Sequence, residues 1–296
     1  MIDSIVQDIK RAMNSGTMIT RIIMVNVGLF VLINLLKVFT MGAGPGVFIS
    51  VKNILSLPSD PITLIKQPWS IITHMFLHIG FWHIFWNMLL FYWFGRIVGD
   101  FLGDKRILPI YILSGLFGGL VYILSDHFLG GTGGNAFALG ASAAVMAMLW
   151  TAASLSPDYI MHLILIGPVK LKYIALAILF LDIIATASMI NSGGHFAHLG
   201  GALFGMLYVY MLRRGTDMTS ILSFNRNENP KRRKTAKKHF KVVYREEPGA
   251  KSDDSKNRPS EQQSELDRIL DKINAQGYDK LTEEEKEFLY QASKKK

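Results

Sequence analysis

Residues 80–98 read GFWHIFWNMLLFYWFGRIV, a run whose length and apolar character suit a helix that crosses a bilayer. Two polar side chains interrupt this run, His83 and Asn87, which are four residues apart and therefore lie on one face of a helix. Polar groups at membrane depth are energetically expensive and usually belong to a functional site. The stretch therefore predicts a membrane helix and one wall of a site.

Five further segments have a comparable apolar composition. They lie at residues 21–39, 106–124, 142–155, 172–189 and 195–212. Hydrophobic residues make up 50% of the chain, which is more than ordinary soluble proteins need. Residues 41–68 mix apolar residues with Gly, Pro and Ser, and we expect this first outer loop to lie partly in the membrane interface. The sequence predicts an all-α membrane protein, a six-transmembrane helical bundle at residues 21–214.

Lys and Arg residues gather on one side of this predicted bundle. The short loops on the other side, residues 125–141 and 190–194, contain neither residue type. By the positive-inside rule both chain termini are cytoplasmic, as an even number of crossings requires. Residues 1–20 form the cytoplasmic N-terminal segment, and they lack the apolar core and small-residue cleavage site of a signal peptide.

Polar groups converge at the outer ends of three predicted helices. A serine hydroxyl becomes a nucleophile when a neighbouring base takes its proton, and Ser142 and His198 can supply this pair. Oxyanion donors can come from His83, from Asn87 and from the backbone N–H of Ser142 at a helix N-terminus. No carboxylate is obviously placed to orient His198, and Asp182 in the fifth helix has no partner that the sequence identifies. The residues therefore support a dyad.

The order and spacing of these motifs resemble those of the rhomboid family of intramembrane serine proteases. The matching stretches, within residues 60–214, are Gly-Ala-Ser at 140–142, Ala-His-Leu-Gly-Gly at 197–201, and His83 followed by Asn87. The resemblance implies that Ser142 is the nucleophile and His198 the base, with His83 and Asn87 stabilising the oxyanion. It also implies transmembrane-protein substrates that enter laterally, hydrolysis without a metal or nucleotide cofactor, and a bacterial inner membrane with the site open to its outer face.

Small residues in the same motifs predict close packing at the site. Gly140 ends a glycine-rich stretch whose backbone can approach another element closely. Gly201 and Gly205 match the small positions that bring the fourth and sixth helices together in the family. Met146 stands where the family often has an aromatic residue, and methionine can still pack against an imidazole.

Three other classes of function stay open. A catalytically inactive, rhomboid-like protein that binds membrane proteins would keep the fold, although both Ser142 and His198 are present here. A membrane metalloenzyme would use the histidines, but no acidic residue accompanies them as in H-E-x-x-H. These histidines are His74, His78, His83, His195 and His198. A transporter would show repeated halves with broken helices, which the sequence lacks.

The individual site residues also have structural alternatives. Ser142 alone could be a helix N-cap, because serine satisfies free backbone N–H groups. His198, or His83 together with Asn87, could instead make hydrogen bonds between helices.

A charged tail follows the predicted bundle. Residues 215–296 carry 19 of the 32 basic and 15 of the 23 acidic residues. We expect residues 215–259 to be a disordered basic linker. Its block at 231–238, which begins with Lys231 and ends with Lys238, is expected to attract anionic lipid headgroups and not nucleic acid.

The last residues, 260–296, contain the start and stop signals of two short helices. Ser260 with Gln263 and Thr282 with Glu285 are capping boxes, and Gly277 is a helix stop. We expect a helical hairpin with Leu266, Ile269, Leu270 and Ile273 on one face of its first helix. So few residues rarely hold a core alone, so the hairpin is expected to need a partner that the sequence does not identify.

Overall fold

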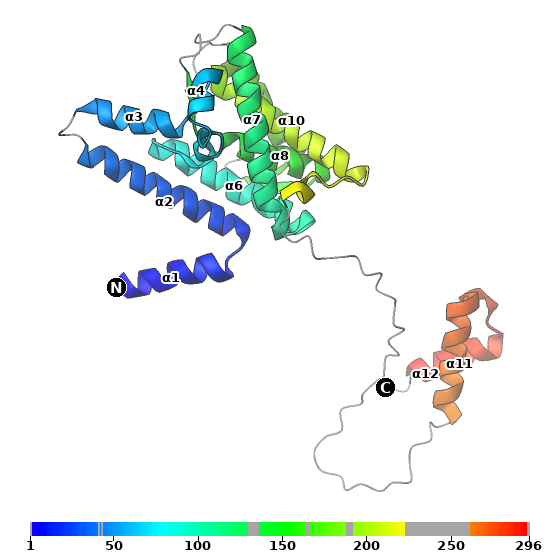
Figure 1. Ribbon diagram of the computed structural model, residues 1–296. Coiled ribbons are helices and arrows are strands. Elements are labelled where there is room, and N and C mark those ends of the chain that lie inside the picture. Colours follow the sequence, from blue (N-terminus) through cyan, green and yellow to red (C-terminus); the bar gives the residue numbers. More distant parts are fainter. Residues whose placement is uncertain are drawn as a thin grey trace. The chain divides into compact units, whose positions relative to one another are not determined.

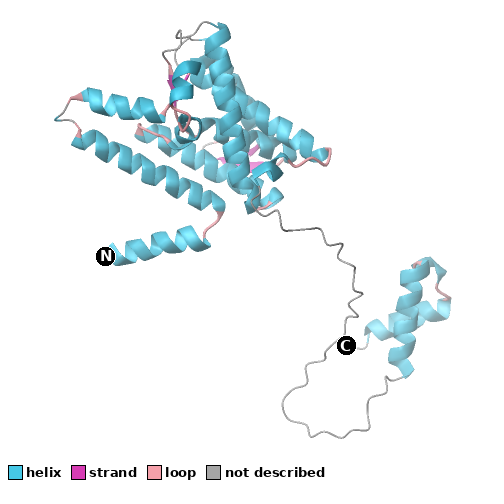
Figure 2. Cartoon of the chain, in the orientation of Figure 1, coloured by secondary structure: helices cyan, strands magenta, loops and turns pink. Residues whose placement is uncertain are grey.

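The computed structural model describes residues 2–40, 42, 44–129, 136–163, 166–187, 192–222 and 261–294. Most of this part of the chain is helical (Figures 1 and 2). It forms two compact units, Met1–Asn229 and Pro230–Lys296. The predicted all-α fold is confirmed.

Six helices occupy the segments that were predicted to cross the membrane. They are α2 (Met18–Phe39), α6 (Phe81–Leu102), α7 (Ile107–Leu129), α8 (Ser142–Leu155), α9 (Leu171–Ala187) and α10 (Ser192–Arg213). By length and composition, α2, α7 and α10 can each cross a membrane. Helix α6 meets the same criterion together with the short helical segment Ser70–Phe76, to which it is bent by 89°. The count of six crossings stays a prediction.

Other elements flank or connect these helices. They are α1 (Ile2–Ser15), α3 (Pro45–Leu55), β1 (Leu57–Pro58), α4 (Pro61–Lys66), α5 (Ser70–Thr73), η2 (His74–Phe76), η3 (Asp104–Arg106), β2 (Phe137–Ala138), β3 (Ile160–Leu163), β4 (Gly167–Lys170) and η4 (Met218–Leu222). The first outer loop is thus largely helical, and α3 buries none of its residues. Two short antiparallel pairs, β1 with β2 and β3 with β4, complete the unit.

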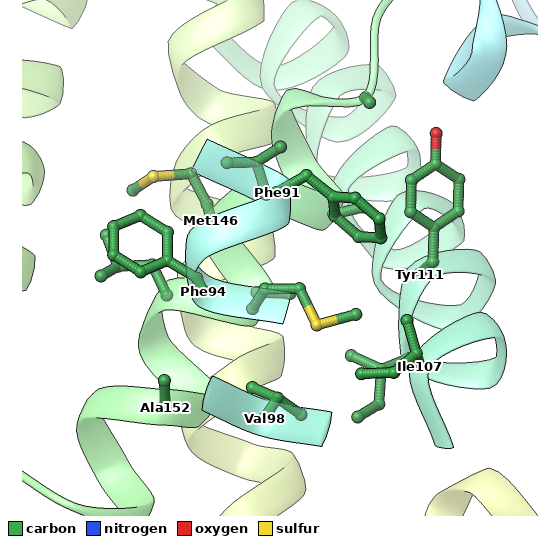
Figure 3. Packing of buried hydrophobic residues seen from close by; sticks show 14 of the residues in the cluster. Phe91, Phe94, Val98, Ile107, Tyr111, Met146 and Ala152 are labelled. Carbon is green, nitrogen blue, oxygen red and sulfur yellow. The ribbon is translucent and has the colours of Figure 1, made fainter. Parts of the chain in front are cut away.

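Helix α8 lies at the centre of the first unit. It packs against α6, α7, α9 and α10, and ten of its 14 residues are buried. Figure 3 shows Met146 and Ala152 of α8 in the same core as Phe94 of α6 and Tyr111 of α7. A short helix that is apolar on every side is expected at such a position. Its first residue is Ser142.

Glycines set the separation of α8 from α10. A Cβ built on Gly201 would lie 2.1 Å from the carbonyl oxygen of Ala143, and one on Gly205 would lie 2.6 Å from that of Ala147. Neither position has room for a larger residue, so the two backbones are in direct contact, as small-residue packing in membranes requires.

The end of the first unit corrects one boundary predicted from the sequence. Residues 215–222 were expected in the disordered linker, but η4 packs against α7 and α10. Asp217 accepts a hydrogen bond of 2.8 Å from Nε of Arg106 and two more from Thr219, whose side chain is buried. The block 231–238 lies outside the described residues.

The second unit contains α11 (Glu261–Gln276), η5 (Tyr278–Lys280) and α12 (Glu283–Lys294). Helix α11 ends before Gly277, which has a φ of +86°, as predicted. The backbone N–H of Thr282 donates to Glu285, and that of Glu285 donates to Thr282, which is the reciprocal pattern of a capping box. Ile269 is buried, whereas Leu270 is exposed, so the predicted apolar face is narrower than expected. Ser260 lies outside the described residues.

Candidate active site

One cavity of about 520 Å³ collects polar groups from several helices. His83 comes from the first turn of α6, Ser142 from the start of α8, and His198 from the second turn of α10. Gly140 lines the same cavity. The N-terminal ends of α6, α8 and α10 therefore meet at one place, although they are far apart in the sequence.

The backbone just before Ser142 requires a glycine. Gly140 has a φ of +117°, a conformation that other residues rarely adopt. A Cβ built there would lie 2.7 Å from Cε1 and 2.8 Å from Nε2 of His83. The imidazole of His83 consequently rests against the chain two residues before the candidate nucleophile.

Two histidines hold the turn that precedes Ser142. The backbone N–H of Gly140 donates to the carbonyl oxygen of His74 at 2.8 Å, and that of Ala141 donates to Nε2 of His78 at 3.3 Å. Both histidine side chains are buried. In the sequence they stood out only among the histidines of the metalloenzyme alternative, and the structure adds that the carbonyl of His74 and the side chain of His78 hold the start of α8.

Ser142 is the first residue of α8 and not its N-cap. The N-cap residue is Ala141, which has no side chain that can cap. The hydroxyl of Ser142 is therefore not used for capping, and the residue lines the cavity. This geometry removes the support for the N-cap alternative.

His198 has a carboxylate partner that the sequence did not reveal. Its Nδ1 lies 2.8 Å from Oδ1 of Asp182, and Nδ1 of His195 lies 2.8 Å from the same oxygen. The sequence showed no carboxylate placed beside His198, and the structure corrects this. Asp182 lies on α9 and its partners lie on α10, so only the packing of these helices brings them together.

A family model described as Rhomboid domain matches residues 66–215, which is half of the chain. The chain belongs to the rhomboid family. It is thus an integral membrane protein. The rhomboid domain includes the cavity residues discussed above, together with Asp182 and the two histidines that contact it. These are His83, Gly140, Ser142, Asp182, His195 and His198.

Individual relatives match parts of the rhomboid domain. The RHOMBOID-like protein 12, mitochondrial, of Arabidopsis thaliana is 28% identical over 157 residues, which are 49% of this chain and 47% of that protein. The rhomboid protease GlpG of Salmonella newport is 34% identical over 86 residues, which are 29% of this chain and 31% of that protein. The chain thus spans less than half the length of these relatives. A second model, described as Family of unknown function (DUF6576), matches residues 255–295.

Two residues expected at the site lie deeper in the rhomboid domain. The side-chain amide of Asn87 donates to the carbonyl oxygen of His83 at 2.8 Å, and Asn87 is not among the residues that line the cavity. Met146 is buried in the core cluster one turn below Ser142. In this conformation both support the wall of the site and not its surface.

Asp182, His195 and His198 are also close enough to one another to hold a metal ion, since their ligand atoms lie within 4.8 Å. The metal alternative had lacked an acidic residue, and Asp182 supplies one. However, tetrahedral zinc with bonds of about 2.0–2.1 Å holds its N and O ligands roughly 3.3 Å apart. The 2.8 Å contacts have the length of hydrogen bonds.

Proposed function

We propose that the chain is an intramembrane serine endopeptidase that hydrolyses peptide bonds in or near transmembrane segments of membrane proteins. Ser142 is the nucleophile and His198 the base. The observation that carries this proposal is that Ser142, His198 and His83 line one cavity although they belong to three different helices. Membership of the rhomboid family and the similarity to a rhomboid protease support it.

The reaction begins when Oγ of Ser142 attacks the carbonyl carbon of the scissile bond and its proton passes to Nε2 of His198. The oxyanion that forms is stabilised by His83 and by the backbone N–H of Ser142, with Asn87 as a further donor if its amide turns toward the cavity. The C–N bond then breaks, and the leaving amine takes the proton from His198. Water attacks the acyl ester, gives a proton to His198, and the released Ser142 recovers it.

The proposed substrates are transmembrane proteins that enter the site laterally. The proposed location is a bacterial inner membrane, with both termini cytoplasmic and the cavity open to the outer face. The lack of Lys and Arg in the loops 125–141 and 190–194 supports this orientation. Lipid contact by residues 231–238 and a partner for the C-terminal hairpin stay predictions.

The test uses the full chain, purified in detergent and then reconstituted in liposomes. We expect a fluorophosphonate to label the wild type and a model transmembrane substrate to be cut, with both signals lost in Ser142→Ala and His198→Ala. Ser125→Ala is the matched control, because Ser125 lines the same cavity but donates its hydroxyl to the carbonyl oxygen of Tyr122. Cleavage that persists in Ser142→Ala refutes the proposal.

The same experiment separates the two alternatives. A wild type that is neither labelled nor active, but retains membrane proteins specifically, would be an inactive rhomboid-like binding protein. Cleavage that is abolished by a chelator and insensitive to fluorophosphonate would favour a metal ion at Asp182, His195 and His198, the one cluster that suits it in the part of the chain that is described.

A further inference from the structure

We propose that Asp182 is a positioning residue that fixes the tautomer and orientation of His198, so that the site works as a triad and not as a dyad. The inference rests on the proposed roles of Ser142 and His198. It concerns a residue outside the motifs that the family resemblance supplies.

The geometry defines which ring nitrogen carries the proton. An ionised carboxylate only accepts hydrogen bonds, so Nδ1 of His198, at 2.8 Å from Oδ1 of Asp182, must be the donor. In a neutral imidazole, Nε2 then has the free lone pair. That is the atom that must receive the proton of Ser142, and an imidazole of the other tautomer could not receive it.

The second histidine holds the carboxylate itself. His195 donates from its Nδ1 to the same oxygen at 2.8 Å, and it precedes His198 by three residues on the same face of α10. Asp182 is therefore held by two donors from α10. When His198 takes a proton and becomes cationic, the carboxylate stays in place to stabilise the charge.

The burial of the Asp182 carboxylate indicates that its negative charge has a functional role. The side chain of Asp182 is only 9% exposed. Its second oxygen, Oδ2, has no hydrogen-bond partner within the described ranges. A neutral amide oxygen would accept from two histidines with a smaller desolvation penalty, so a purely structural contact does not require a carboxylate. A negative charge stabilises a cation that forms during the reaction more strongly than a neutral oxygen does, so a carboxylate suits that role.

The test measures kcat and KM for the reconstituted full chain. Asp182→Asn keeps the size of the side chain but removes its charge, and we expect kcat to fall about 10²- to 10⁴-fold with KM within about twofold. Asp182→Glu restores a carboxylate and should recover at least about a tenth of the lost kcat. Asp158→Asn removes an exposed carboxylate that pairs with Lys170 and Lys172, and it should leave kcat unchanged.

A second readout does not depend on activity. In ¹⁵N-histidine-labelled protein, the His198 signal, assigned by its loss in His198→Ala, should show a proton on Nδ1 in the wild type and a shift toward Nε2–H in Asp182→Asn.

The two proposals fail in different ways. A wild type without Ser142-dependent cleavage would refute the proposed protease, whereas the spectrum would still show whether Asp182 fixes the tautomer of His198. Unchanged kcat in Asp182→Asn, or Nε2–H in the wild type, overturns the inference. If Asp182→Asn does not fold, the inference is tested by the tautomer of His198 in the wild-type spectrum and by the kcat of Asp182→Glu.

Discussion

The imidazole of His83 occupies the space into which a side chain at Gly140 would project, with Cε1 only 2.7 Å from the position of a Cβ. This contact thus joins the N-terminal end of α6 to Gly140, whose conformation directs the backbone into α8. The position of His83 and the path of the backbone before Ser142 depend on each other.

Gly140→Ala tests this contact. We expect the variant to lose about 1–3 kcal/mol of stability through backbone strain. Cleavage should fall about 10²-fold because the nucleophile is displaced. Gly103→Ala is the control, since Gly103 also has a positive φ, +87°, but has no atom within 4 Å of its Cβ position. If Gly103→Ala and Gly140→Ala behave alike in thermal unfolding and in cleavage assays, the contact with His83 has no effect of its own.

Gly201→Ala tests the packing of α10 on α8. The added methyl group would overlap the carbonyl oxygen of Ala143. Overpacking of this kind should lower the free energy of unfolding by about 1–3 kcal/mol or more. Gly28→Ala in α2 adds the same group where no atom lies within 4 Å, and it should be neutral or slightly stabilising. Thermal denaturation in detergent compares the two, and equal melting temperatures would contradict the expectation.

Asp217 makes the stability of the first unit dependent on pH. Burial opposes ionisation of its carboxyl, but hydrogen bonds from Thr219 and Arg106 outweigh this and lower its pKa. A lowered pKa contributes stability above the ordinary aspartate pKa of about 4, and this stability is lost as the pH falls through the lower, folded value.

Asp217→Asn should therefore cost about 1 kcal/mol at pH 7, because Arg106 is partly exposed. The difference from the wild type should begin to shrink near pH 4 and vanish once the pH lies below the lowered, folded pKa of Asp217. Unfolding at a series of pH values in detergent measures it. A difference that is constant with pH would show that the charge does not matter.

Glu285 is expected to stabilise the start of α12 in the C-terminal hairpin. Lys272 and the backbone N–H of Thr282 both donate to its carboxylate and lower its pKa. In the full chain, Glu285→Ala removes the acceptor and should speed hydrogen exchange in the first turns of α12. Glu284→Ala truncates an exposed side chain next to it and is the control. Equal exchange in both variants would argue against the capping role.

The sequence predicted the helices and the close approaches that glycines mark, and it missed side-chain contacts between helices that no motif marks. Apolar runs located the long helices, and the glycines at 140, 201 and 205 identified the close approaches. The partners of Asp182 lie on the next helix, and nothing in the spacing alone shows which faces of α9 and α10 meet. One signal was available, because a buried acid needs a donor and His195 and His198 share a face. Likewise, Asp217 was assigned to the linker because its partner, Arg106, is distant in the sequence.

The attachment of Asp182 to α9 and of both imidazoles to α10 has a kinetic consequence. Any motion that separates α9 from α10 also moves Asp182 away from His198. A substrate that has just entered between separated helices would therefore react slowly. Reaction would wait until the helices had closed again. A substrate segment that dissociates before the helices close would not be cut. The time that a segment stays bound would then select among substrates as much as its sequence does.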